Sequence, residues 1–358
     1  MARLRVGLIG CGFIGRFHSR NLRGLERLGL IDLDYAAVCD VVEERARSFA
    51  EAAGVERAVT DAGELIDSPE IDALYVCVPT AGHKELVLRA AERGKHVFCE
   101  KPLATTLADV EEMVSAVSEA GVKAGVGLVL RHAPIFTVLK SLTGDERLGR
   151  LMAIVFRDDQ FFPIQGHYAS DWRKDRRQVG AGTLLEHSIH DVDILRWLAG
   201  DVVSVRGTTG NFAGYEGVED LALAHLEFES GARAELVSVW HNLRGRPSTR
   251  RLEMFFENGM FAIDDDFFGP IRYQGEEGPM RTLGEGEVRR RYLDLVGLTG
   301  QPFEDALGRY GLADYFFVKA VAEGSEPFPG FPLALEAHRV VDAIYRSAAA
   351  GGDEIALT

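Results

Sequence analysis

Short apolar runs alternate with helical apolar periodicity through the first 130 residues. Runs such as Leu4–Ile9 and Leu33–Cys39 are largely apolar, as is typical of strands buried on both faces. The segments between such runs repeat apolar residues at helical spacing. This alternation predicts βαβ units and a parallel sheet covered on both sides. The predicted strands are 4–9, 33–39, 72–78, 96–99 and 122–130, and the predicted helices are 14–28, 45–53, 82–93 and 107–120.

The pattern changes after residue 150, where strands follow one another directly. Two short segments, 229–231 and 257–259, carry the Asn, Ser and Gly residues of hairpin turns. Strands in succession with helices apart predict a second, α+β domain with a mostly antiparallel sheet. The predicted strands are 151–162, 202–209, 220–228, 232–240, 250–256 and 260–263, the predicted helices are 183–198, 313–322 and 333–349, and 163–178 is predicted as a loop.

Length and composition narrow the class of protein. A chain of 358 residues is too long for one ordinary core and fits two domains, predicted here as 1–130 and 131–358, with the last helices packing back on the first domain. The net charge of −15 argues against nucleic acid and anionic membranes as partners. Cys11, Cys39, Cys77 and Cys99 lie in or beside apolar runs, so we expect buried, reduced thiols and a cytoplasmic protein.

A glycine-rich loop joins the first strand to the first helix. It reads Gly10-Cys11-Gly12-Phe13-Ile14-Gly15. Glycines let the backbone turn tightly and approach a pyrophosphate, and the helix N-terminus directs free N–H groups at the phosphates. Because the loop has a strand before it and a helix after it, it predicts a dinucleotide site. A nucleotide-free domain of the same fold is the alternative.

Asp40 ends the second predicted strand, where a carboxylate accepts the hydroxyls of the adenosine ribose. A carboxylate there repels a 2′-phosphate, which favours NAD over NADP. Arg45 lies close behind it in sequence and could weaken this preference.

Two further segments carry the most specific motifs. The first contains Val78-Pro79-Thr80, His83 and the tripeptide Glu100-Lys101-Pro102. The second runs from Gly180 through Glu186-His187-Ser188-Ile189-His190-Asp191 to Trp197. Together with the glycine loop, they resemble the Gfo/Idh/MocA oxidoreductases, the family of glucose-fructose oxidoreductase and inositol dehydrogenase, over nearly the whole chain.

The resemblance implies a Rossmann domain followed by a substrate domain with a large open sheet, and an active site between them. It implies a catalytic group of Lys101, Glu186 and His190. It also implies cofactor contacts at Pro79, Thr80, His83, Glu100 and Lys101. The acid is more often aspartate in the sugar and inositol dehydrogenases, so Glu186 departs from that pattern, and His187 is an added feature.

The residue chemistry agrees with alcohol oxidation. A neutral imidazole such as His190 can take the hydroxyl proton. Lys101 can stabilise the developing alkoxide. On the predicted helix 183–198, Glu186 and His190 are four residues apart and would share one face with Asp193 and Trp197. A metal site is the rival, but Glu-His-x-x-His lacks the spacing of zinc-binding helices, and we predict no metal.

Polar and aromatic residues in the second half are candidates for binding a hydroxyl-rich ligand. The candidates are Arg131, Gln160, His167, Trp172, Arg173, His187 and His241. An ordinary polar loop is the alternative for any one of them.

The sequence therefore predicts an NAD-dependent oxidoreductase that moves hydride to or from a secondary alcohol of a sugar or cyclitol. Two alternatives stay open: a glycosidase-like member that oxidises transiently and eliminates, and a dinucleotide-sensing protein without catalysis. An open sheet face also predicts a homodimer or homotetramer, with Leu221, Leu223, Val237 and Val239 as candidate contacts.

Overall fold

The computed structural model describes residues 3–309 and 311–357. The chain forms two compact units. The first comprises the residues up to Val129 together with Gly300–Leu335, and the second comprises Leu130–Thr299 and the residues from Glu336 onward.

The first unit contains a six-stranded parallel sheet in the order β3-β2-β1-β4-β5-β6. This is the strand order of the Rossmann fold, and the chain reverses direction across the sheet between β1 and β4. The α/β prediction is confirmed. The strands are β1 (Leu4–Ile9), β2 (Leu33–Cys39), β3 (Arg57–Val59), β4 (Ala73–Val76), β5 (His96–Cys99) and β6 (Ala124–Val126).

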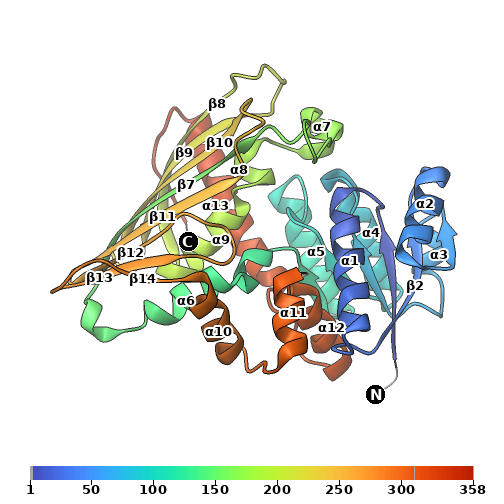
Figure 1. Cartoon of the computed structure of the whole chain (residues 1–358). Helices are drawn as coiled ribbons and strands as arrows, with labels where there is room; N and C mark the ends of the chain where they lie inside the picture. Colours follow the sequence, from blue (N-terminus) through green and yellow to red (C-terminus); the bar gives the residue numbers. More distant parts are fainter. Residues whose placement is uncertain (1–2, 310, 358) are drawn as a thin grey trace. The chain divides into compact units, whose positions relative to one another are not determined.

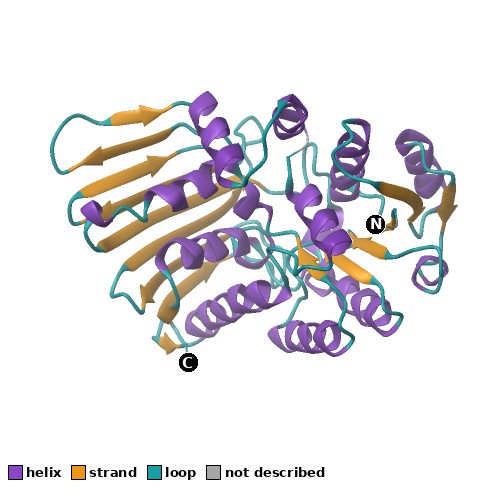
Figure 2. Cartoon of the chain, turned by 90° about the horizontal axis from the view of Figure 1, so that it is seen from below, coloured by secondary structure: helices purple, strands orange, loops and turns teal. Residues whose placement is uncertain are grey.

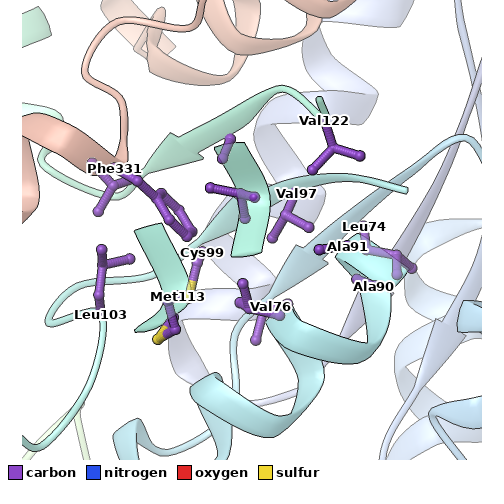
Figure 3. Close-up of a cluster of buried hydrophobic side chains, with 14 of the residues drawn as sticks. Leu74, Val76, Ala90, Ala91, Val97, Cys99, Leu103, Met113, Val122 and Phe331 are labelled. Carbon is purple, nitrogen blue, oxygen red and sulfur yellow. The ribbon is translucent and has the colours of Figure 1, made fainter. Parts of the chain in front are cut away.

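Helices cover this sheet and bury a core of branched aliphatic residues. Figure 3 shows side chains of β4 and β5 packed against those of the neighbouring helices, with Phe331 among them. The four cysteines are buried and free, as expected. The helices of this unit are α1 (Phe13–Arg27), α2 (Glu43–Ala53), α3 (Gly63–Ile66), η1 (Thr80–Gly82), α4 (His83–Glu92), α5 (Leu107–Glu119), α11 (Gln301–Arg309) and α12 (Ala313–Glu323).

The second unit contains a nine-stranded sheet in the order β14-β13-β12-β11-β7-β10-β9-β8-β15 (Figure 1). Every neighbouring pair is antiparallel except β7 and β10, so the predicted mostly antiparallel sheet is confirmed. The strands are β7 (Leu151–Phe161), β8 (Val202–Gly210), β9 (Leu221–Phe228), β10 (Arg233–His241), β11 (Thr249–Phe256), β12 (Gly259–Ile263), β13 (Ile271–Gly275), β14 (Arg281–Leu283) and β15 (Ile355–Ala356).

One face of this sheet is buried and the other is exposed. Even-numbered side chains of the central strands, such as Phe156 and Leu252, are buried beneath helices that lie along that face (Figures 1 and 2). Odd-numbered residues such as Val155, Leu223 and Phe255 are exposed on the other face. The helices are η2 (Val129–His132), α6 (Pro134–Leu142), η3 (Glu146–Leu148), η4 (Asp171–Lys174), α7 (Arg176–Val179), α8 (Thr183–Glu186), α9 (Ile189–Ala199), α10 (Glu285–Leu295) and α13 (Phe331–Ala349), the last of which begins in the first unit.

The predicted helix over 183–198 is wrong in one respect that matters for the site. It is two helices, α8 and α9, separated at His187 and Ser188. The carbonyl of Thr183 accepts hydrogen bonds from the backbone N–H groups of both residues, which widens the turn. The four-residue spacing of Glu186 and His190 therefore does not place them on one continuous helical face.

Other differences are smaller. The predicted strand 122–130 is shorter, because η2 begins at Val129, and the loop 163–178 contains η4 and α7. Helices α6, α10 and α11 and strands β3, β13 and β14 were not predicted. No helix of the described residues is long and apolar enough to cross a membrane.

Candidate functional site

The glycine loop has the crowded geometry that its motif predicts. Gly10 adopts a φ of +105°, and a Cβ there would lie 2.5 Å from the carbonyl carbon of Cys77. A Cβ on Gly15 would lie 2.0 Å from the carbonyl oxygen of Gly10. At Gly12, by contrast, nothing described lies within 4 Å of that position. Two glycines are thus required by packing, and the third leaves the backbone open before α1, as a dinucleotide pyrophosphate requires.

Asp40 lies at the end of β2, but its carboxylate is already engaged. It accepts hydrogen bonds from the N–H groups of Cys11 and Val42 at 3.0 and 2.9 Å. Nε and Nη2 of Arg45 add two more at 2.8 and 2.7 Å. Burial raises the pKa of Asp40, but Arg45 and the backbone donors outweigh it and leave the pKa lowered. Arg45 would have to shift for Asp40 to bind a ribose.

Arginines gather beside this carboxylate, in a groove of about 560 Å³ between α1 and α2 that begins at Cys11. Small residues such as Gly24 and Ala52 form part of its lining. On a chain with a net charge of −15, this is a local positive surface next to the predicted adenosine end. The arginines are Arg16, Arg20, Arg23, Arg27 and Arg45.

The turn after β5 presents Lys101, and Glu100 holds that turn through both of its carboxylate oxygens. Oε2 of Glu100 accepts the backbone N–H of Lys101 at 3.1 Å. Oε1 lies 2.8 Å from Nε2 of His18, whose Nδ1 lies 2.7 Å from Oδ1 of Asp314. Burial lowers the pKa of His18, but the two carboxylates outweigh it and raise the pKa to about 10. A buried imidazolium thus joins α1, α12 and the Glu100–Lys101 turn.

His83 holds the other side of the same turn. Its Nδ1 lies 2.9 Å from the carbonyl oxygen of Pro102, and its Nε2 lies 2.9 Å from that of Val78. Pro79 follows β4, and Thr80 and His83 are buried. His83 and Glu100 thus contact the protein and hold the turn that carries Lys101, while their expected contact with the cofactor stays a prediction.

In the second unit, Glu186 ends α8 and its carboxylate is buried against Arg173. Oε2 of Glu186 accepts a hydrogen bond from Nε of Arg173 at 3.1 Å, and the guanidinium of Arg173 lies 4.4 Å from the ring centroid of Trp172. Glu219 fixes the start of α8, because its carboxylate accepts the N–H groups of Gly182 and Leu184. Three predicted site residues therefore lie together: Glu186, Arg173 and Trp172.

His187 lies in the break between α8 and α9, over a buried charged cluster. Its Nε2 lies 2.9 Å from Oδ2 of Asp158. Arg250, fully buried, pairs with Asp158, Asp191 and Asp266. His190 follows in the first turn of α9 and is buried. This cluster places several charged side chains on the buried sheet face.

The other predicted substrate residues divide between the two faces of the sheet. Gln160 is buried on the helix-covered face, next to Trp240 in register. Among the described residues, Oε1 of Gln160 and Nε1 of Trp240 have no hydrogen-bond partner. His241 points to the opposite face, where its Nε2 lies 3.7 Å from Asp159. The structure thus separates His241 from the Glu186 group.

Arg131 and His167 have other surroundings. Arg131 donates two hydrogen bonds of 2.8 Å to Asp193, and its guanidinium lies 5.2 Å from the ring centroid of Trp197. His167 is exposed and its ring packs against Tyr168, with centroids 4.1 Å apart. Arg131 therefore acts first as a structural partner of α9.

The sequence did not point to His18, Asp158 or Arg250. One signal was present for His18, because it shares the apolar stripe of α1 with Leu22 and Leu25. Asp158 and Arg250 interrupt the apolar alternation of β7 and β11 at inward positions. A polar residue on an inward face is the pattern that could have identified all three.

Metal ligation has no geometric support among the described residues, where no group of three or more His, Cys, Asp or Glu side chains is placed to hold an ion.

Comparison with known proteins identifies the family. The model of an oxidoreductase family with an NAD-binding Rossmann fold, GFO_IDH_MocA, matches residues 4–128, and that of the GFO/IDH/MocA C-terminal domain matches residues 136–262. The chain belongs to the Gfo/Idh/MocA oxidoreductases, and its first unit is their NAD-binding domain.

Three similar proteins illustrate the range of the family. Myo-inositol 2-dehydrogenase from Thermotoga maritima is 34% identical over 269 residues, which cover 73% of this chain and 75% of that protein. Inositol 2-dehydrogenase 3 from Saccharopolyspora erythraea is 32% identical and covers 85% of each chain. A levoglucosan dehydrogenase in complex with NADH has the same fold, with a TM-score of 0.84 over 99% of each chain at 23% identity.

Proposed function

We propose that this protein is an NAD-dependent dehydrogenase that oxidises a secondary alcohol of a sugar or cyclitol, or reduces the ketone, with Lys101, His190 and Glu186 as its catalytic group. The observation that carries the proposal is the position of Lys101. It is the second residue after β5, at the carboxyl edge of the parallel sheet where such folds bind ligands. Glu100 and His83 hold its turn from two sides.

Each residue has a distinct task in this proposal. When bound, NAD supplies the nicotinamide carbon that accepts a hydride. The Lys101 ammonium stabilises the negative charge that develops on the substrate oxygen. His190 takes the hydroxyl proton as a neutral imidazole. Glu186, held by Arg173, orients the imidazole or accepts a substrate hydroxyl.

The substrate class rests on the polar groups of the second unit and on the relatives. The buried orphan atoms Gln160 Oε1 and Trp240 Nε1 are an acceptor and a donor that ligand hydroxyls can satisfy. Trp172 adds an aromatic surface beside Arg173. The two relatives compared above at 34% and 32% identity are inositol dehydrogenases, which supports a polyol.

For the cofactor we propose NAD, with NADP less favoured. Asp40 carries the negative charge that disfavours a 2′-phosphate, while Arg45 and the arginine groove reduce that penalty. We therefore infer a preference that is smaller than an isolated aspartate would give.

We further propose that the protein is cytoplasmic and forms a homodimer or homotetramer through the exposed sheet face. Of the expected contacts, Leu223 is exposed there, and Leu221, Val237 and Val239 are partly exposed. Apolar side chains exposed on a sheet face favour association.

A spectrophotometric screen of polyols and sugars with NAD and NADP tests the function. We expect NADH to form with at least one cyclitol or sugar. A glycosidase-like member would instead release a sugar product with no net change in nicotinamide absorbance. A dinucleotide sensor would bind NADH and transform none of the substrates, and either result would contradict the proposal.

A further inference from the structure

Three neighbouring strands place polar residues in one row on the mostly apolar inner face of the large sheet. Arg250 of β11 is paired in register with Asp158 of β7, and Asp158 is paired with Ser238 of β10. All three side chains are buried. Residues paired across strands point to the same face, so this row lies beneath α8 and α9.

The break between α8 and α9 adds polar groups from above. The hydroxyl of Ser188 lies 3.1 Å from Oδ2 of Asp158 and 2.6 Å from the hydroxyl of Ser238. Nε2 of His187 lies 2.9 Å from the same carboxylate oxygen. Oδ1 of Asp191 accepts a hydrogen bond of 2.6 Å from Nε of Arg250.

One oxygen of each buried aspartate is left over. Within the described part of the chain, Asp158 Oδ1 and Asp191 Oδ2 accept no hydrogen bond from any donor. Arg250 brings the two carboxyl groups together, since its Nη2 lies 3.4 Å from Oδ2 of Asp158 and its Nε lies 2.6 Å from Oδ1 of Asp191. Two ionised carboxylates have only acceptors and repel each other, whereas one proton between them satisfies both oxygens.

The charge balance of the cluster requires the same proton. Among the described residues, the buried guanidinium of Arg250 faces Asp158, Asp191 and the partly buried Asp266. A fully ionised cluster would bury a net negative charge, which is costly.

The electrostatics of the pair agree with this geometry. Burial raises the pKa of both carboxyls against the pull of Arg250, and that of Asp191 rises to about 7. The pKa of Asp191 is the more strongly raised of the two, so we assign the shared proton to Asp191. His187 and Asp266 are the other titratable groups that face the pair. The charges of Asp158, Arg250 and Asp266 also act on the pKa of Tyr168.

We propose that Asp158 and Asp191 share one exchangeable proton, and that His187 passes this proton between the buried pair and a reaction site beside His190; the second half rests on the function proposed above. His187 suits this task because its side chain contacts Asp158 and is 14% exposed. His190 belongs to the same turn, since its N–H donates to the carbonyl of His187 at 3.3 Å.

Alcohol oxidation releases this proton, and ketone reduction consumes it. Oxidation of a secondary alcohol breaks one C–H and one O–H bond; the C–H electron pair leaves with its hydrogen as a hydride to the nicotinamide, and the hydroxyl hydrogen leaves as a proton. When both Asp158 and Asp191 are ionised, the pair takes up that proton. The protonated pair then returns it to water through His187. In the reductive direction the same proton goes to the new hydroxyl.

Infrared difference spectroscopy of the full chain tests the shared proton without any substrate. As the pH is raised from about two units below neutrality to about two units above, the wild-type spectrum should lose the carbonyl band of one protonated carboxylic acid. Asp191→Asn should lack that band at every pH, because its amide replaces the donor. Asp159→Asn is the matched control, since Asp159 lies next to Asp158 on the opposite sheet face and has a lowered pKa; its band should equal that of the wild type.

An absent band in the wild type, or an unchanged band in Asp191→Asn, would overturn the shared proton. If Asp191→Asn does not fold, the proposal is tested by Asp158→Asn, whose band should differ from that of the wild type, and by the pH titration of the wild-type band.

Kinetics test the transfer. In wild type, kcat should show an ionisation near neutral pH that Asp191→Asn loses, with kcat about tenfold lower and KM changed less than about threefold. A pH profile identical in both proteins would overturn the role of His187 and the pair. If the wild type oxidises no sugar or cyclitol, the proposed function fails while the infrared result stands.

Discussion

Nε2 of His18 lies 2.8 Å from Oε1 of Glu100, the residue that precedes Lys101. The opposite nitrogen of the same ring lies 2.7 Å from Asp314, nearly 300 residues further along the chain. The orientation of the proposed catalytic lysine therefore depends on a helix near the C-terminus. The same helix packs Phe317 and Val318 into the core, and Gly300–Leu335 belongs to the same compact unit as the first 129 residues.

The first prediction concerns the pH dependence of stability. The pKa of His18 is about 10 in the folded chain and about 6.5 when unfolded. Because the folded pKa is raised, the stabilisation by His18 is complete below about pH 6.5 and is lost as pH rises towards 10. The difference in unfolding free energy between wild type and His18→Gln, measured by urea denaturation, should therefore shrink across this range.

His96→Gln provides the control, because burial lowers the pKa of His96 and its contribution stays constant above neutrality. At neutral pH the cost of His18→Gln should be about 3 kcal/mol, as for other broken buried ion pairs. A difference that does not vary with pH would show that His18 is neutral in the folded protein.

The second prediction concerns cofactor selectivity. Arg45 neutralises Asp40, so Arg45→Ala should leave the carboxylate free to repel a 2′-phosphate. We expect kcat/KM with NADP to fall about tenfold, or about 1.4 kcal/mol, relative to the value with NAD. Arg47→Ala is the matched control, since Arg47 lies on the same helix and pairs with the exposed Glu43. Tighter binding of NADPH than NADH by the wild type would contradict the role of Asp40.

The third prediction concerns Glu186. Glu186→Gln should lower kcat by about a hundredfold, while NADH affinity stays the same. The reason is that a neutral amide replaces the carboxylate that orients the His190 imidazole or binds a substrate hydroxyl. Arg173→Met should lower kcat in the same direction, since it removes the ion pair that Arg173 makes with the buried carboxylate of Glu186. Arg177→Met, which removes an exposed arginine from the same loop, is the control. A larger effect on NADH affinity than on turnover would contradict the assignment.

The fourth prediction concerns assembly. Leu223→Lys should shift the protein towards the monomer in light scattering, because a lysine would replace an apolar contact on the exposed sheet face. Leu243→Lys replaces an exposed leucine in a loop and should leave the mass unchanged. A wild-type monomer would contradict the interface.

The sequence predicted the elements whose period is clear, and both sheets follow from them. Runs such as Leu4–Ile9 and Leu33–Cys39 could be placed within a residue because their apolar pattern ends at glycine or charge. The short strands β3 and β14, with three residues each, carry no period to detect. The break at His187 was missed because no glycine or proline marks it. The contacts of His187 and Ser188 with Asp158 of the sheet are tertiary and leave no local signal.

The site was predictable as a set of residue types but not as contacts. Lys101 and the glycine loop have local signatures, and the structure gives them the expected local geometry. The partners of Glu100 and Glu186, by contrast, come from distant segments: His18 and Arg173. Such pairings depend on tertiary packing, and the spacing of residues along a single sequence does not predict them.

Turnover by Lys101→Ala tests the central claim most directly. Initial rates of NADH formation would be measured at a saturating concentration of the best polyol from the screen, and NADH binding would be measured by fluorescence in the same preparations. We predict that kcat falls by about a hundredfold to a thousandfold while the dissociation constant for NADH changes less than about twofold. A Lys101→Ala protein that oxidises the polyol at the wild-type rate would contradict the account.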